Sequence, residues 1–107
     1  MSAAPPATMA AFVCSALTPD LSGTAMARVP VPTPATGEAL VKVSAAAINF
    51  PDILMCQGLY QFKPDPPFIP GLDFAGEVRA LGPDTDGPAP GTAVMGGARL
   101  GAMADYV

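Results

Sequence analysis

Residues 38–81 read EALVKVSAAAINFPDILMCQGLYQFKPDPPFIPGLDFAGEVRAL, and the order of polar and apolar positions in this stretch predicts two strands around one short helix. From Glu38 to Ala46, polar and apolar positions alternate with the two-residue period of a strand that has one buried face. The apolar positions are Val41, Val43 and Ala45. A similar alternation of apolar and charged residues recurs from Leu72 to Leu81, so we predict a strand there as well, with its other face in solvent.

The segment between these strands predicts a helix of about two turns, from Pro51 to Gln57. Pro51 suits the first helical position, because its missing N–H has no partner there in any helix. Asp52 lies near the positive end of the helix dipole, and Gly58 supplies a left-handed stop. A helix this short is unstable alone, so we expect it to pack against the strands.

The flanking segments predict more short strands, at Met9–Cys14, Thr92–Met95 and Met103–Val107. Prolines at every second position of residues 29–34 remove ladder donors and predict an extended edge or polyproline-like segment. Residues 1–7 offer little to pack, and we expect a disordered lead-in. Several short strands at turn-rich intervals predict a mainly β fold, a small partly open barrel or sandwich with one or two short helical turns.

Composition limits the function classes. A chain of 107 residues makes one domain at most, which we place at residues 8–107. A net charge of −4 with only five scattered Lys and Arg residues argues against nucleic acid and against a polybasic membrane contact. No apolar run approaches the length of a membrane span, and the apolar stretch 9–17 lacks a positively charged lead. We therefore expect a cytoplasmic protein.

The chain carries no histidine and only two cysteines, Cys14 and Cys56, so three or four Cys/His ligands for a structural zinc cannot be assembled. We predict two buried thiols, with Cys56 an apolar packing residue rather than a nucleophile. The glycines of residues 96–101 lack a strand-to-helix context, which favours a turn over a phosphate loop.

Two motifs in sequence order carry a family resemblance. They are NFPDILMCQGLY at residues 49–60 and PGLDFAGEV at residues 70–78. Together they resemble the N-terminal, GroES-like domain of the medium-chain dehydrogenase/reductase superfamily, in its zinc-free quinone oxidoreductase branch. In zinc-dependent relatives a cysteine stands at the place of Asn49, and a His-Glu pair stands at Leu72 and Asp73. Asparagine is a poor zinc ligand and leucine is none, so the resemblance implies no catalytic metal.

The resemblance implies an oxidoreductase that uses NADPH to reduce a quinone, an enone or another activated alkene. The Rossmann domain that binds the cofactor in this superfamily is absent from these 107 residues. It is expected in the same or a longer chain, with the cofactor in the cleft between the two domains. The isolated chain is therefore expected to be inactive, and a homodimer stays open.

The resemblance also implies site residues. Asn49 is predicted to lie beside the nicotinamide, as a catalytic and cofactor-binding residue; the alternative is an N-cap of the helix. Asp52 is predicted as a cofactor-binding residue, and its simpler role is support of the helix dipole or orientation of a neighbour. Tyr60 is predicted to line the substrate pocket and donate to a carbonyl oxygen, or else to be a half-buried packing aromatic. No residue is predicted to bind metal.

Two further positions qualify this interpretation. Asp73 is expected to be structural, facing Arg79 or solvated on its strand. Leu54 stands where some relatives have a tyrosine, and it cannot polarise a carbonyl. A second function stays open, a cofactor-free GroES-like binding or assembly module that associates through exposed strand edges. A reading frame that continues into a strand, a Gly-rich turn and a helix favours the oxidoreductase.

Overall fold

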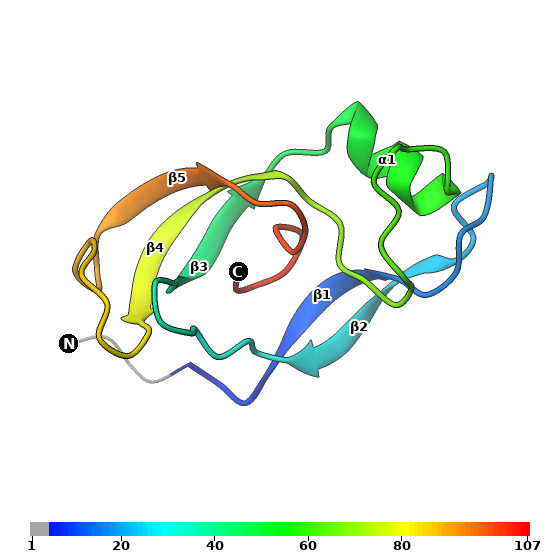
Figure 1. Cartoon of the computed structure of the whole chain (residues 1–107). Coiled ribbons are helices and arrows are strands. Elements are labelled where there is room, and N and C mark those ends of the chain that lie inside the picture. Colours follow the sequence, from blue (N-terminus) through cyan, green and yellow to red (C-terminus); the bar gives the residue numbers. More distant parts are fainter. Residues whose placement is uncertain (1–4) are drawn as a thin grey trace.

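The computed structural model describes residues 5–107, which form two antiparallel sheets and a short helix (Figure 1). The elements follow in the order β1 (Thr8–Cys14), β2 (Thr24–Pro30), β3 (Ala39–Ala46), α1 (Phe50–Gln57), β4 (Asp73–Leu81) and β5 (Ala93–Gly97). The predicted mainly β fold is confirmed. Of the predicted lead-in, residues 1–4 lie outside the described residues.

The three-stranded sheet has the order β3-β4-β5, and its β3 strand departs from the predicted simple alternation. The pairing with β4 shifts register between Leu40 and Val41 and again between Val43 and Ala45. At the first shift the extra residue is Arg79 on β4, and at the second it is Ser44 on β3. Leu40 and Val41 are both buried although they are neighbours, whereas Ala45, predicted to be buried, is exposed.

The second sheet pairs β1 with β2, from Thr8 opposite Pro30 to Cys14 opposite Thr24. The predicted first strand is confirmed, but β2 was not predicted. Most of its side chains are exposed, so it shows no alternation that marks a strand. The strand ends at Pro30, the first proline of the run at residues 29–34, where a ladder donor is missing.

The last five residues close the gap between the sheets. The backbone N–H of Phe12 donates to the Met103 oxygen at 2.9 Å, and that of Val43 donates to the Asp105 oxygen at 2.8 Å. In Figure 1 this red segment runs between β1 and β3. The predicted strand at Met103–Val107 is therefore wrong as a regular strand, because its residues form only isolated bridges, at Ala104 and Tyr106. The result is the partly open barrel.

The core consists of two clusters of buried side chains. One joins β1 to α1 and contains Cys14, Met55, Cys56 and Phe68. The other lies under the barrel strands and contains Met9, Leu40 and Tyr106. The prediction of two buried thiols is confirmed, and burial, together with the neighbouring Cys14, raises the pKa of Cys56 to about 12. Among residues 5–107, no helix is long or apolar enough to cross a membrane.

Candidate active site

The pairing of β3 with β4 brings the two sequence motifs together. Because the strands are antiparallel, the end of β3 lies beside the start of β4, with Ala46 opposite Phe74. The Ala47 N–H donates to the Asp73 carbonyl oxygen at 3.1 Å and extends the contact past the strand. Two residues later, the Asn49 Nδ2 donates to Asp73 Oδ2 at 2.8 Å. Residues 24 positions apart in sequence thus form one polar pair.

Asn49 is also the N-cap of α1, so the structural alternative for this residue is confirmed. Its backbone is extended, with φ −110° and ψ 160°, and it forms a capping box with Asp52. The Asn49 N–H donates to Asp52 Oδ2 at 2.9 Å. At the other end Gly58 adopts the predicted left-handed conformation, with φ 76°. Local capping therefore sets both where α1 begins and how Asn49 is held.

Asp52 lies beneath Asn49 rather than on the surface. Its exposed fraction is 2%, and its Oδ1 has no hydrogen-bond partner within the described part of the chain. Asp52 lines a hollow of about 200 Å³ together with Ile53 and Cys56, and its role as a cofactor-binding residue stays a prediction. Its position agrees with the other predicted role, which is to orient a neighbour, here through the backbone of Asn49.

Tyr60 lies past the opposite end of α1. A helix of eight residues is roughly 12 Å long, so the structure does not bring Tyr60 to Asn49. The ring is half-buried and packs on the cluster of Cys14, Met55, Cys56 and Phe68, as the packing alternative predicts. The Tyr60 hydroxyl makes no hydrogen bond within residues 5–107, so it can donate one to a ligand.

The surface around the Asn49–Asp73 pair is apolar and exposed. Ile48 and Phe50, on either side of Asn49, are 74% and 70% exposed, and Met95 on β5 is 85% exposed. Met95 and Asp73 line a shallow hollow of about 350 Å³ whose other walls are Ala45, Ala46, Ala47, Phe74 and Ala75. Exposed apolar side chains near polar groups are common where a surface binds a ligand or another domain; of the three, only Met95 lines the hollow with Asp73, and Ile48 lines a separate one. We refer to Ile48, Phe50 and Met95 as the apolar rim.

Sequence reasoning missed the role of Asp73. The predicted contact with Arg79 is wrong, because Arg79 lies 3.6 Å from Glu77, whereas the other alternative, an exposed position on the strand, is confirmed. The signal that identifies the true partner is the antiparallel order of β3 and β4, which places the residues after one strand beside those that begin the next.

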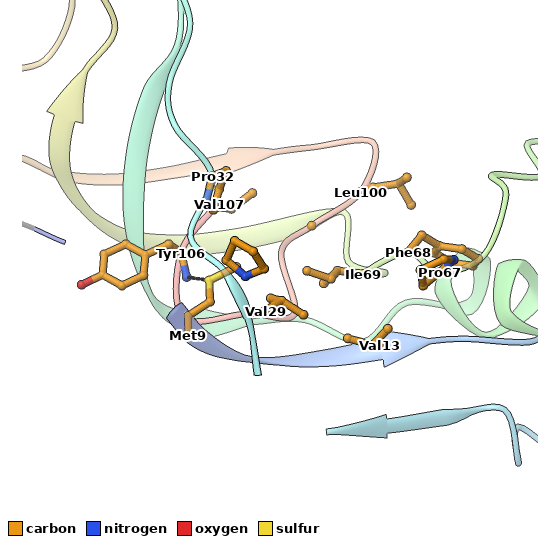
Figure 2. A pocket seen from close by; sticks show the side chains of 12 residues that line it. Met9, Val13, Val29, Pro32, Pro67, Phe68, Ile69, Leu100, Tyr106 and Val107 are labelled. Atoms are coloured by element: carbon orange, nitrogen blue, oxygen red, sulfur yellow. Dashed lines mark hydrogen bonds between the residues drawn. The ribbon is translucent and has the colours of Figure 1, made fainter. Parts of the chain in front are cut away.

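A larger hollow of about 520 Å³ lies elsewhere, between β1, the loop at residues 67–69 and the C-terminal segment (Figure 2). Its walls are apolar side chains and prolines, and none of the residues that line it carries a charge. The Tyr106 N–H donates to Met9 Sδ at 3.3 Å, and the Tyr106 ring extends away from the other labelled side chains (Figure 2). This hollow offers packing space but no group for catalysis.

Within residues 5–107, no three side chains of the His, Cys, Asp or Glu type cluster closely enough to hold a metal ion. The buried Cys14 and Cys56 lie close together, with Cys14 Sγ at 4.0 Å from the Cys56 carbonyl oxygen. Two thiols alone do not complete the four-ligand set of a structural zinc.

Comparisons with known proteins agree with this architecture. Residues 35–107 match the alcohol dehydrogenase GroES-like domain. Quinone oxidoreductase-like protein 2 of Mus musculus is 43% identical over 68 residues, which cover 64% of this chain and 19% of that protein. The chain thus spans about a fifth of the length of the curated relatives it matches.

Two solved structures extend the similarity over almost the whole chain. A probable oxidoreductase from Mycobacterium abscessus superposes with a TM-score of 0.83 at 36% identity, covering 96% of this chain and 32% of that one. The human synaptic vesicle membrane protein VAT-1 homolog-like protein gives 0.88 at 32% identity, covering 94% and 32%. The chain therefore belongs to the alcohol dehydrogenase GroES-like domain family, as a quinone oxidoreductase-like N-terminal domain of the medium-chain dehydrogenase/reductase superfamily.

Proposed function

We propose that this domain forms the substrate side of a zinc-independent oxidoreductase that uses NADPH to reduce a quinone, an enone or another activated alkene. The observation that carries the proposal is the Asn49 amide, held at 2.8 Å by Asp73, whose own side chain lines a hollow that is otherwise apolar. A polar group fixed within apolar walls orients a flat, weakly polar ligand. The quinone oxidoreductase-like names of the relatives support the same substrate class.

In this proposal the residues of the domain position the reactants, and the bound nicotinamide supplies the hydride. Asn49 hydrogen-bonds the cofactor or the substrate. Tyr60, about a helix length away, donates to a carbonyl oxygen of a substrate that extends along α1. The apolar rim of Ile48, Phe50 and Met95 excludes water once it is covered.

Zinc independence follows from the side chains at the places where zinc-dependent relatives carry ligands. Asn49 offers an amide that already donates to Asp73, and Leu72 offers no donor atom. No histidine stands anywhere in the 107 residues to replace them. We therefore expect activity to survive prolonged treatment with a chelator.

A dinucleotide-binding domain completes the site in this proposal, in the same chain or in a longer one. The matching segment is a fifth of the relatives' length, and the apolar rim is the surface that such a domain would cover. The test uses calorimetry on the 107-residue chain and a quinone reduction assay on the product of the complete reading frame. We expect no NADPH binding by the former and NADPH-dependent turnover by the latter. Micromolar NADPH affinity of the 107-residue chain would refute the assignment of the cofactor site to another domain.

A cofactor-free assembly module is the second candidate. The observation that favours it is β5, which pairs only with β4 in the described sheet and carries the exposed Met95 without a charged residue. Such edges pair readily with another chain, including a second copy. Sedimentation of the 107-residue chain distinguishes the two candidate functions. Assembly through β5 gives dimers in the wild type and monomers in Met95→Lys.

A further inference from the structure

The side-chain amide of Asn49 has one acceptor oxygen and two donor hydrogens, and one of these hydrogens has a partner among residues 5–107. At the start of α1 the Asp52 N–H donates to the Asn49 backbone oxygen at 3.0 Å, and the amide oxygen makes no cap hydrogen bond. One Nδ2 hydrogen is donated to Asp73 Oδ2 at 2.8 Å. No acceptor within residues 5–107 takes the second Nδ2 hydrogen. Asn49 therefore keeps one Nδ2 hydrogen without a partner among residues 5–107, on the nitrogen that Asp73 holds.

The carboxylate of Asp73 determines which end of the Asn49 amide, the NH₂ group or the oxygen, faces it. An ionised carboxylate only accepts hydrogen bonds, so the amide must turn its NH₂ group toward Asp73 and its oxygen away. Without such a partner the terminal torsion of asparagine is broad, with two flipped arrangements of similar energy. Asp73 is itself held, because its carbonyl oxygen accepts from Ala47 where β3 meets β4.

We propose that Asp73 is a positioning residue that fixes the Asn49 amide as a hydrogen-bond donor to a carbonyl oxygen of the ligand. The inference rests on the proposed function, since it needs a ligand bound at Asn49. A carbonyl oxygen is present both in the carboxamide of the nicotinamide and in a quinone or enone, and the kinetic test below separates these sources.

The first measurement needs no activity. Asn49 is the only asparagine in the chain, so selective ¹⁵N-asparagine labelling gives a single pair of side-chain NH₂ signals. In the wild type we expect one of the two hydrogens to be displaced from its position in the urea-unfolded chain, because it is bonded to a carboxylate. In Asp73→Ala we expect this hydrogen signal to move to its position in the unfolded chain.

The matched control is Asp86→Ala, which removes the same charge beyond the opposite end of β4. That strand has nine residues and spans roughly 30 Å, so the control leaves the Asn49 signals in place. Unchanged Asn49 signals in Asp73→Ala would show that the contact does not form in solution and would overturn the proposal.

The second measurement is steady-state kinetics on the oxidoreductase that carries this domain and its cofactor domain. We expect Asp73→Ala to lower kcat/KM on the order of 10- to 100-fold, as for a misoriented group in an active site. Asp73→Asn recovers part of the loss, because its amide oxygen still accepts from Asn49. Asp86→Ala has wild-type kinetics.

The kinetic constants of Asp73→Ala identify which carbonyl oxygen accepts the hydrogen bond from Asn49. A weaker NADPH affinity with an unchanged KM for the quinone assigns the donor to the nicotinamide carboxamide, and the reverse assigns it to the substrate. Wild-type kcat/KM in Asp73→Ala overturns the positioning role even where the NMR contact is present. If the wild-type enzyme does not oxidise NADPH, the proposed function is overturned, and so is the role of Asn49 as a donor to the ligand. The NMR result for the hydrogen bond between Asn49 and Asp73 is independent of that outcome.

Discussion

Replacing Gly76 with alanine tests the close approach of β3 and β4, on which the Asn49–Asp73 pair depends. Gly76 lies opposite Val43 in the strand pair, as expected for a glycine at a close approach. A Cβ atom at Gly76 would overlap the backbone carbonyl oxygen of Lys42 and lie 2.9 Å from Val41 Cγ1. Backbone cannot swing aside as a flexible side chain does, so β3 must move away from β4.

The size of the effect follows from two terms. Overpacking of this kind costs about 1 to 3 kcal/mol. Separating the strands also weakens at least two ladder hydrogen bonds, each of which contributes about 1 kcal/mol. The free energy of unfolding should therefore fall by about 3 to 5 kcal/mol, a large share of the 5 to 15 kcal/mol that is usual for a domain.

Gly97→Ala is the matched control, another glycine-to-alanine change in the same sheet. Its Cβ would lie 3.6 Å from the Leu72 carbonyl oxygen, an ordinary contact. Alanine has less backbone entropy to lose on folding, so the control should change stability by less than about 1 kcal/mol, in the stabilising direction.

Thermal unfolding followed by circular dichroism measures both variants. At about 4 °C per kcal/mol, Gly76→Ala should lower Tm by at least 12 °C, while Gly97→Ala stays within about 4 °C of the wild type. A Tm for Gly76→Ala within that same narrow range, or an equal loss in the two variants, would refute the reasoning from the Lys42 contact.

Three further outcomes are expected. Met55 is 1% exposed in the cluster beneath α1, so Met55→Ala should cost about 2 to 5 kcal/mol in urea unfolding, and an unchanged midpoint would contradict that packing. Because burial raises the pKa of Cys56 from 9.0 to about 12, the folded thiol keeps a proton that the unfolded chain releases; stability should fall as pH rises from 9 to 12, and this fall should shrink in Cys56→Ala. A steeper fall in that variant would reverse the sign of the argument. Tyr60→Phe should keep the wild-type Tm but lower kcat of the oxidoreductase on the order of 100-fold, and wild-type turnover would leave Tyr60 with its packing role alone.

The helix and the site residues differ in how far local sequence could predict them. Pro51, Asp52 and Gly58 predicted α1 to within a residue, because capping and left-handed backbone are properties of a few neighbouring residues. Asp73 was predicted to face Arg79 or to lie solvated on its strand. It is exposed, but its partner Asn49 was not predicted, because Asn49 lies 24 positions away and only strand pairing brings it close.

The strands show the same division. Met9–Cys14 and Leu72–Leu81 were recognised from their apolar runs and alternation, which arise wherever one face of a strand is buried. The two bulges in the pairing of β3 with β4 and the strand β2 were not recognised. A bulge depends on the partner strand, and β2 is held mainly by its pairing with β1 rather than by a buried face of its own.

By itself, then, the sequence determined the family, the mainly β class, the short capped helix and the absence of histidine ligands, because each is written in composition or in residues close together along the chain. Only the tertiary structure decided that Asp73 holds Asn49, that Asp52 is buried beneath it, and that residues 103–107 join the two sheets. The physical reason is that hydrogen bonds between distant segments depend on strand register, and register is set by the packing of the whole barrel.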